Sequence, residues 1–320
     1  MSSFPPELHE AATRFLTCEF VTIDSAGRPI VWPVTPYFHG DEDCIDVSTG
    51  LGYPKKADDA ERNPRVALLF SDATGSGLHD PPTVLVQGTA SVDDRNLEAN
   101  RERFERELAD KLPALAAQAP PEPLRRMFSW YYTRIYVHVR PERVYVWPGA
   151  DLEAEPQLYD ARVEEVRSGH NEEPEEGHAP PEGGMDVWDP RLDRLGPHDS
   201  TGVIAFVGPD GFPFAVRVPV RADRDAHVVH IDSDPVGAPI EAGPACLCAH
   251  AHAPDFSWQR SYQVRGDLRE HDGRWTLHPH RVVAGLQLPS SAIERYRVNV
   301  RKILRFRKTA RERTLSREPR

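Results

Sequence analysis

The sequence predicts a mainly β (α+β) protein built from two tandem β domains, and three observations support this. The chain has 320 residues, which is long for one hydrophobic core and fits two domains of about 150 residues each. Its 31 prolines and 21 glycines separate short apolar runs, which favours strands and turns over a helix bundle. Third, the order of strand-like segments in the first half returns in the second.

Residues 1–150 form the first predicted domain. A short helix begins after Pro5 and Pro6, and residues 19–50 then alternate strand-like runs with Gly-containing or acidic turns, which predicts a β-meander. Two more strands follow at 65–72 and 83–92. A helix with an apolar stripe runs from Leu97 to Leu112, and residues 134–147 read as two strands that end at Trp147.

Residues 151–189 differ sharply in composition from their flanks. They contain 13 Asp and Glu residues but only two arginines, so they lack the apolar surface needed to order themselves. We expect an acidic, Pro/Gly-rich linker. Residues 293–320 carry 11 Lys and Arg against three Glu, and we expect a basic C-terminal helix that docks on the acidic body, followed by a tail.

Residues 190–292 repeat the first half and form the second predicted domain. Gly27-Arg28-Pro29 corresponds to Gly211-Phe212-Pro213 at an offset of 184 residues, and Gly88 corresponds to Gly266 at an offset of 178. A repeat of this length indicates two copies of one domain.

Charge and cysteine content narrow the classes of partner. The net charge of −11 and the lack of a nucleic-acid motif give no reason to expect a nucleic-acid partner. The four cysteines include no Cys-x-x-Cys, the N-terminus lacks the apolar core of a signal peptide, and no apolar run is long enough to span a membrane. We therefore expect a cytoplasmic protein with reduced thiols.

The segment from Ser48 to Lys56 combines three features that bind phosphate. Ser48 and Thr49 supply hydroxyl groups at a strand end, the loop at Gly50–Gly52 and the helix start that follows offer backbone N–H groups, and Lys55 and Lys56 supply positive charge. The expected ligand carries a phosphate.

The ordered set of motifs around this segment resembles the pyridoxamine 5′-phosphate oxidase-related, FMN-binding split β-barrel superfamily. The resemblance rests on Gly27-Arg28-Pro29, Thr49, Lys55-Lys56-Ala57 and Asn63-Pro64-Arg65-Val66, and it continues to Trp147 over about 150 residues. It implies two tandem split barrels with a few flanking helices, in which this chain is a tandem-repeat member.

The resemblance also implies roles for individual residues. Lys56 resembles the lysine that binds the FMN phosphate, and Lys55 occupies the neighbouring basic position. Thr49, with Ser48 beside it, resembles the hydroxyl residue at the strand end. The strand from Val31 to Thr35, which carries Trp32 and Val34, would run along the flavin ring, and Trp147 resembles a tryptophan near the flavin.

Departures from the pattern favour a reductase over pyridoxamine phosphate oxidation. Trp32 and Tyr37 stand where the oxidases carry an arginine and a lysine, and the segment from Gln157 to Arg162 lacks the oxidases' histidine. The first hypothesis is an FMN-dependent oxidoreductase that acts on an unknown small-molecule substrate, a small organic compound, and transfers hydride through flavin N5. The alternatives are a reductase that uses the deazaflavin F420 and a non-enzymatic haem- or flavin-binding barrel. We assign no catalytic residue.

The second copy should not bind a flavin phosphate. Its corresponding loop has no Lys or Arg and adds Asp234 and Glu241, which would repel a phosphate dianion. We expect one flavin per chain, in a pseudo-dimer of barrels. Whether two chains pair further as a homodimer stays open. In the same half, one face of a predicted strand carries Cys246, Cys248, His250 and His252. These side chains could ligate a metal or haem, or they could have a purely structural role. The structural role is favoured, so we assign no metal ligand.

Overall fold

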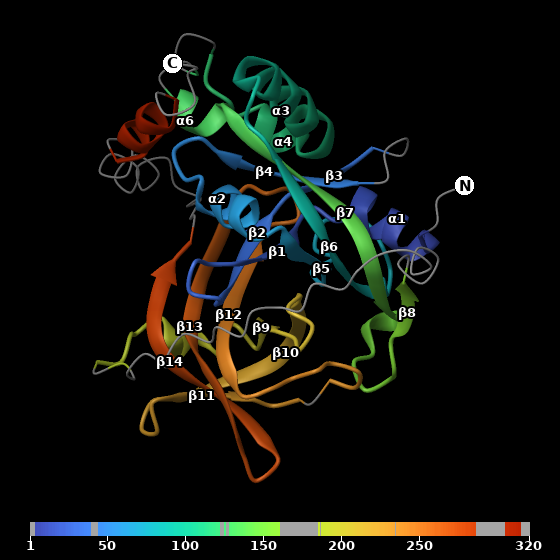
Figure 1. The fold of residues 1–320 in the computed structure, drawn as a ribbon, viewed down its shortest axis with the longest axis vertical. Helices are drawn as coiled ribbons and strands as arrows, with labels where there is room; N and C mark the ends of the chain where they lie inside the picture. The colour runs from blue at the N-terminus through green and yellow to red at the C-terminus, as the bar shows by residue number, and fades with distance from the viewer. Residues whose placement is uncertain are drawn as a thin grey trace.

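Two β units make up the protein in the computed structural model, which describes residues 4–39, 44–121, 125, 128–160, 185, 187–233, 235–285 and 305–314. One unit is an eight-stranded curved sheet and the other is a closed six-stranded barrel (Figure 1). The mainly β fold predicted from the sequence, with a few flanking helices, is confirmed.

The first sheet has the strand order β2-β1-β5-β6-β7-β4-β3, and β8 pairs with β7. The strands are β1 (Cys18–Ile23), β2 (Pro29–Val34), β3 (Pro36–Phe38), β4 (Ile45–Gly50), β5 (Arg65–Phe70), β6 (Thr83–Asp93), β7 (Arg134–Trp147) and β8 (Gln157–Asp160).

This sheet is buried on both faces, and the two-residue period of its strands divides the side chains between two cores. In β5, Val66, Leu68 and Phe70 face a core within the first unit. Ala67 and Leu69, which alternate with them, face a second core that is built mostly from the other unit. The continuous apolar run of β5 is therefore explained by burial on both sides.

The closed barrel has the order β10-β11-β14-β13-β12-β9. Its strands are β9 (Thr201–Val207), β10 (Pro213–Asp223), β11 (Val228–Ile231), β12 (Gly243–His252), β13 (Gln259–His271) and β14 (Arg274–Ala284). Because the barrel is closed, its strands can also be read in the other direction from β10, as β10-β9-β12-β13-β14-β11. In this direction the order corresponds to the path β2-β1-β5-β6-β7-β4 of the first sheet. The hairpin registers also match, because Ile23 pairs with Pro29 and Val207 pairs with Pro213.

A bulge lies at corresponding places in the two units. The register of β6 with β7 shifts at Gly88, opposite Pro141, and the register of β13 with β14 shifts at Gly266, opposite Pro279. The sequence predicted two strands within residues 134–147, and this was wrong because β7 is continuous. Proline is tolerated inside a strand at such a bulge, where the ladder is already interrupted.

Replacing Gly88 by alanine is expected to destabilise the protein by about 1–3 kcal/mol or more, because the new methyl group overpacks the bulge. A Cβ at Gly88 would lie 2.2 Å from the carbonyl oxygen of Arg140, a backbone atom that cannot rotate away. Urea denaturation measures the change. Gly149→Ala is the control, since nothing lies within 4 Å of its Cβ and the only cost is its φ of +60°. Equal losses in the two variants would contradict the clash.

Three longer helices flank the first sheet: α1 (Pro6–Arg14), α2 (Lys55–Arg62) and α3 (Leu97–Lys111). Asn96 caps α3 by accepting a hydrogen bond from the backbone N–H of Ala99 at 3.1 Å, and Pro113 follows its last turn. Phe104 and Leu108 bury the inner face of α3 against β7. The short helices α4 (Pro113–Ala116) and α6 (Ser129–Tyr132) lead from α3 into β7.

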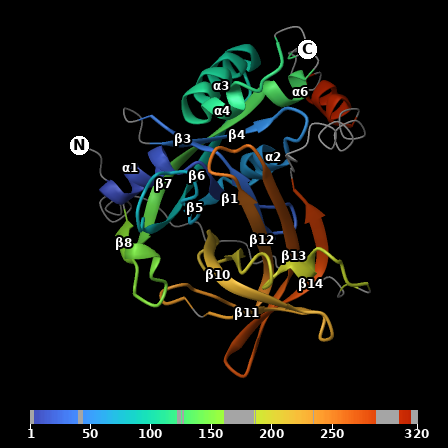
Figure 2. The same cartoon turned by 180° about the vertical axis from the view of Figure 1, so that it is seen from behind.

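A further helix at residues 305–314 docks on the first unit beside α6 and α2, as both views show (Figures 1 and 2). The ring centroid of Phe306 lies 5.0 Å from that of Trp130 and 5.5 Å from that of Tyr53. Arg313 forms ion pairs with Asp94, at 3.0 Å, and with Asp58 of α2. The basic segment is thus held by an aromatic contact at one end and by carboxylates at the other.

The two units contact each other reciprocally. The edge strand β2 contacts β9, β12 and β13 of the barrel, and β10 contacts β1, β5 and β6 of the first sheet. Two buried glutamines join backbone across the junction: Gln263 Nε2 donates to the carbonyl of Val31 at 2.5 Å, and Gln87 Nε2 donates to that of Pro213 at 2.9 Å. The barrel therefore covers the open edge strand β2 of the first sheet, and β10 of the closed barrel packs against that sheet in return.

A buried ion pair also joins the units. The carboxylate of Glu19, which is 0% exposed, accepts hydrogen bonds from Arg217 Nη2 at 2.8 Å and from Ser71 Oγ at 2.9 Å. His250 Nε2 lies 2.6 Å from the same carboxylate. Burial alone would raise the pKa of Glu19, but Arg217 and His250 outweigh it and hold that pKa below its ordinary value.

Part of the predicted linker packs on the first unit. Residues 157–160 form β8 on the edge of β7, whereas Trp188, near the other end of the predicted linker, is buried in the core built mostly from the barrel, with its ring centroid 5.6 Å from that of His227. Residues 161–184 of that linker, and 293–304 and 315–320 of the predicted C-terminal segment, lie outside the described residues. None of the helices in the described part of the chain has the length and apolar character that a membrane crossing requires.

Candidate anion-binding site

The candidate site lies where β4 ends and α2 begins. The connecting loop from Leu51 to Pro54 packs under α6 and the 305–314 helix. A Cβ at Gly52 would lie 2.8 Å from Phe306 Cβ and 3.1 Å from Trp130 Cβ. Glycine at this position therefore allows the helix to approach the loop closely.

The loop's own polar groups bind other parts of the protein. The backbone N–H groups of Leu51, Gly52 and Tyr53 donate to carbonyl groups of Thr133, Trp130 and Gly50 at 2.9–3.0 Å. Thr49 is fully buried, and its hydroxyl donates to the carbonyl of Tyr53 at 2.9 Å. Ser48 pairs with Tyr136 in the β4–β7 ladder. Thr49 and the amides of residues 51–53 thus stabilise the turn and are not donors for an anion.

The two lysines of the loop have different surroundings. The side chain of Lys55 is 45% exposed, and its amine lies 2.8 Å from Asp59 Oδ2 within α2. Arg62 binds the same carboxylate at 3.1 Å. The charge of Lys55 is therefore compensated inside its own helix.

Lys56 is buried, with 9% of its surface exposed. Its amine lies 5.4 Å from the ring centroid of Trp32 and 5.7 Å from that of Tyr53. Burial, with a smaller contribution from the nearby Arg134, lowers the pKa of Lys56 from 10.5 to about 7. Among the described residues, no carboxylate contributes to that pKa, so the ammonium ion has aromatic neighbours but no anion.

Arg134 is a second buried cation beside Lys56, and the sequence analysis did not identify it. Its Nη1 donates to the hydroxyl of Tyr53 at 3.0 Å, and its guanidinium stacks over Phe104 and Tyr131 at 3.8 and 4.6 Å from their ring centroids. Its Nε is buried without a hydrogen-bond partner among the described atoms. The structure thus places two buried cations side by side without a described carboxylate to neutralise them.

The strand predicted to run along a flavin ring, β2, is the edge strand of its sheet. Its Trp32 lies next to Lys56 and donates through Nε1 to Thr22 Oγ1 at 3.4 Å. Val34 is buried in the core of the first unit. The β2 strand contacts β12 and β13 of the barrel, where Val31 is buried in the core built mostly from that unit. Trp32 packs instead against the core of the first unit.

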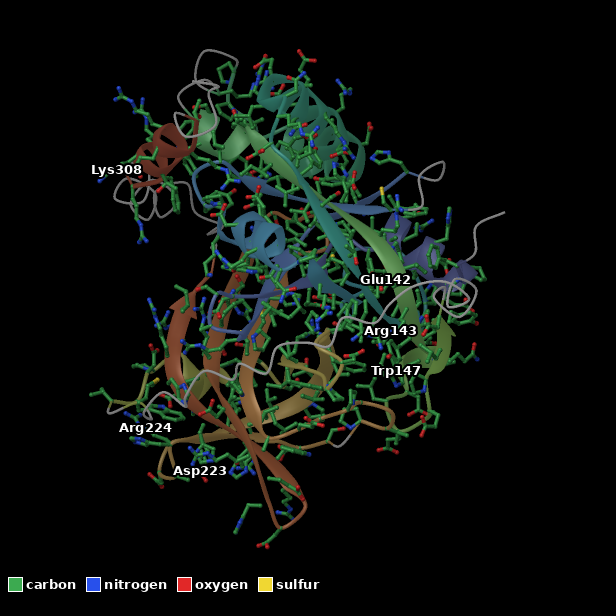
Figure 3. All side chains as sticks on the ribbon, in the orientation of Figure 1. Glu142, Arg143, Trp147, Asp223, Arg224 and Lys308 are labelled. Atoms are coloured by element: carbon green, nitrogen blue, oxygen red, sulfur yellow. The ribbon has the colours of Figure 1, made fainter. Side chains whose placement is uncertain are left out.

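Trp147 is not part of this cluster. It lies at the opposite end of β7 from Arg134, and Figure 3 shows it far from the 305–314 helix that carries Lys308. Its side chain is fully buried between the units, where its ring packs edge-on against Phe214 at 6.3 Å. The structure therefore brings Lys56 together with Trp32 but places Trp147 elsewhere.

The histidines of β12 contact protein groups. His250 Nε2 lies against Glu19, as described above, and His252 Nε2 lies 3.2 Å from Thr17 Oγ1. The Nδ1 atom of His252 lies 2.9 Å from the carbonyl oxygen of Ala253. Cys246 and Cys248 are fully buried, and burial raises the pKa of both thiols. These contacts agree with a structural role for the alternating Cys and His residues.

Comparisons with known proteins give a limited likeness. No family model matches the chain, and no curated protein matches it. Among solved structures, general stress protein 26 from Bacillus anthracis str. Sterne is 18% identical, with 48% of this chain and 96% of that chain covered and a TM-score of 0.31. A structure described as an F420 reductase is 18% identical, covering 44% and 98% at a TM-score of 0.33.

The haem storage protein HutZ from Vibrio cholerae is also 18% identical, with 44% of this chain and 93% of that chain covered and a TM-score of 0.32. Each of these three matches spans less than half of this chain. At these identities and TM-scores, the likeness gives no evidence that this chain shares a cofactor or an activity with them.

Proposed function

We propose that this chain binds the phosphate of a flavin, FMN in the first instance, at Lys56 and Arg134 and serves as a flavin-dependent oxidoreductase. The observation that carries the proposal is the pair of buried cations without a described carboxylate partner. Burying an uncompensated charge is costly, and a phosphate dianion would remove that cost for both side chains at once.

The residues present fit such a group. The amine of Lys56 and the orphan Nε of Arg134 supply charged donors, and charge-assisted hydrogen bonds are the strong ones. Trp32 and Tyr53 add aromatic surface beside the amine. The 305–314 helix packs over the loop that leads to Lys56, and exclusion of water by it would strengthen the electrostatic interactions of the site.

A bound flavin or deazaflavin would supply hydride transfer, and the chain would supply binding, orientation and exclusion of water. Lys56 and Arg134 would hold the anionic end, and the edge strand β2 would lie beside the ring. This division of work requires no titratable protein side chain at the reacting atoms, so no catalytic residue is assigned to the chain.

The pairing of the two units supports a pseudo-dimer, in which two copies of one barrel lie in a single chain. The contacts of β2 with β9, β12 and β13 correspond, strand for strand, to those of β10 with β1, β5 and β6. Such a self-complementary interface is typical of twofold homodimers. One unit would then carry the cations and the other would complete the site as its wall.

The test is a binding titration of the purified full-length protein with FMN. Lys56→Met should weaken FMN binding by about 10–150-fold, the equivalent of losing a charged hydrogen bond worth about 1.5–3 kcal/mol. The matched comparison is Lys55→Met, which removes a lysine already paired with Asp59 and should cost much less affinity. Equal affinities in wild type and Lys56→Met would refute the site.

The identity of the cofactor is settled by mass spectrometry of the group released on denaturation, together with the visible absorption spectrum. FMN at one copy per chain supports the first hypothesis. Recovery of F420 keeps the phosphate site and changes the cofactor, whereas recovery of haem alone would overturn the proposal.

A further inference from the structure

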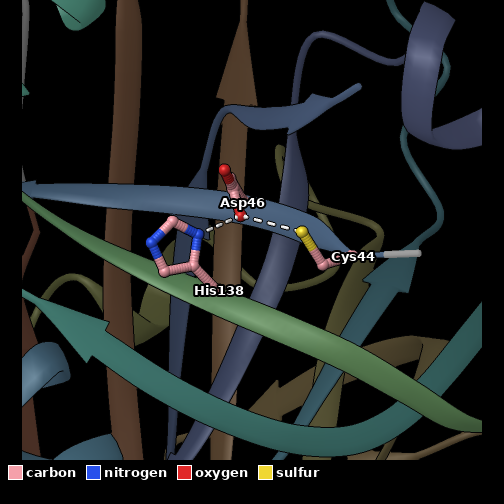
Figure 4. Close-up of side chains that lie close together, drawn as sticks. All are labelled: Cys44, Asp46 and His138. Carbon is pink, nitrogen blue, oxygen red and sulfur yellow. Dashed lines mark hydrogen bonds and ion pairs between the residues drawn. The ribbon is translucent and has the colours of Figure 1, made fainter. Parts of the chain in front are cut away.

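A second group of chemically reactive side chains lies on the β4–β7 strand pair. Asp46 and His138 are direct neighbours across the ladder, and Cys44 stands two residues before Asp46, which places it on the same face. Figure 4 shows the three side chains converging. From sequence alone, nothing indicated that residues 92 positions apart would meet.

The distances within the group suit a metal ion. His138 Nδ1 lies 2.7 Å from Asp46 Oδ1, Cys44 Sγ lies 3.6 Å from the same oxygen, and the three donor atoms all lie within 4.8 Å of one another. Zinc bonds of about 2.0–2.3 Å in tetrahedral geometry separate ligand atoms by about 3.3–3.8 Å. Small rotations of the side chains would therefore open the group enough to receive an ion.

We infer that Cys44, Asp46 and His138 form a zinc-binding site with one open coordination position. Thiolate, carboxylate and imidazole are all zinc ligands, and the soft thiolate disfavours Mg²⁺ and Ca²⁺. Cys44 is half-buried and the side chain of His138 is 28% exposed, while Asp46 is fully buried. The site therefore has a rigid inner ligand and an outer side that solvent reaches.

The surrounding side chains orient the buried ligand. Arg103 of α3 forms an ion pair with the other oxygen of Asp46, Oδ2, which leaves Oδ1 directed toward His138 and Cys44. Glu107 binds Arg103 Nε at 2.7 Å and accepts a hydrogen bond from the hydroxyl of Tyr136 at 2.5 Å. Such outer contacts fix a ligand's direction and tune its metal affinity. The Arg103 charge, which would otherwise repel a cation, is shared with Glu107.

The charges also balance when a divalent ion enters. Binding requires a thiolate at Cys44 and neutral imidazole at His138, so Zn²⁺ replaces the protons that these two groups would release. Binding of zinc involves no oxidation or reduction, because zinc is redox-inactive. The proposed ligand is therefore the ion alone, and its fourth position is available to water or to a small anionic or thiol ligand.

The experiment measures Zn²⁺ binding to full-length protein that has first been treated with a chelator and dialysed. Equilibrium dialysis with metal analysis should give one ion per chain. Cys44→Ser and His138→Gln should each weaken binding by more than the roughly 10–100-fold that loss of an outer contact costs. His39→Gln is the matched control, because His39 contacts Arg103 and Glu107 but is not a proposed ligand.

A second readout uses the thiol itself. Cys18, Cys246 and Cys248 are buried, so Cys44 is the most accessible of the four described cysteines. Zn²⁺ should slow the reaction of the native protein with a thiol reagent, and Co²⁺ should give a thiolate charge-transfer band that disappears in Cys44→Ser. The proposed site would be overturned if the protein bound no stoichiometric Zn²⁺. It would also be overturned if Cys44→Ser and His138→Gln bound Zn²⁺ as wild type does and the metal left the thiol reactivity of the native protein unchanged. Circular dichroism of each variant separates loss of a ligand from loss of the fold.

Discussion

Lys56→Met is expected to stabilise the ligand-free protein while weakening its binding of FMN. The folded protein lowers the pKa of Lys56 from 10.5 to about 7, which corresponds to about 5 kcal/mol spent on charging the buried amine. The aromatic contacts that the substitution removes are worth only about 0.5–2 kcal/mol. The balance therefore favours a higher free energy of unfolding in the variant at pH 6.

The effect of Lys56 on the free energy of unfolding should depend on pH. Between about pH 7 and 10.5 the unfolded chain holds a proton on Lys56 that the folded protein has lost, so stability rises with pH at about 1.4 kcal/mol per unit from this group. Below pH 7 the cost is fully present. The difference between wild type and Lys56→Met, measured by urea denaturation from pH 6 to 9, should shrink as pH rises. A variant that is less stable than wild type at every pH would mean that the lysine is structural.

Saturating FMN should reduce the stability advantage of Lys56→Met over wild type. A ligand that binds only the folded state stabilises it by an amount that grows with the logarithm of the ratio of its concentration to its Kd, so wild type should gain more than Lys56→Met on adding FMN. Lys55→Met should follow wild type in both conditions, because the Lys55 amine is exposed and paired with Asp59. An advantage that shrinks on adding FMN distinguishes a binding lysine from one that merely packs.

Glu19→Ala should destabilise the protein by about 3–5 kcal/mol, the usual cost of removing one partner from a buried ion pair. The substitution leaves Arg217 without its buried carboxylate and removes an acceptor from Ser71 and His250. Because this contact crosses between the units, the effect should appear as lost cooperativity of unfolding as well as a lower midpoint. Thermal and chemical denaturation, followed by tryptophan fluorescence, measure both.

Glu98→Ala is the control, since Glu98 is 69% exposed although it pairs with Arg101 at 2.6 Å. An exposed pair of this kind contributes about 0–1 kcal/mol. The double variant Glu19→Leu/Arg217→Leu should recover much of the loss, because it leaves no unpaired charge behind. If Glu19→Ala costs no more than Glu98→Ala, the pair does not hold the units together.

The sequence predicted those parts of the fold that depend on local periodicity. The apolar strand β5 and the apolar stripe of α3 appear as expected, since each follows from the residues of one element. The continuity of β7 was missed because Pro141 is normally a strand breaker, and only the partner strand at Gly88 reveals a bulge that accommodates it. The predicted linker shows the same limit, because residues 157–160 join the sheet through backbone pairing.

The candidate site was predictable only in part, because some of its residues are brought together by contacts between distant segments. Lys56 stands in a recognisable loop, whereas Arg134 lies in an apolar strand and gains its role from Tyr53 and Phe104, which are distant in sequence. Trp147 could be assigned to a flavin by resemblance, but its neighbours depend on how the two units pack. Contacts that cross between elements carry information that no single segment contains.

The reciprocal junction between the units has an evolutionary consequence. In a dimer of identical chains, one substitution alters both copies of the interface and both copies of any site beside it. Here β2 and β10 occupy corresponding positions but are encoded by separate stretches of one chain, so each mutation changes a single side. One side is thereby free to specialise in recognising a ligand while the other accumulates changes that favour only packing.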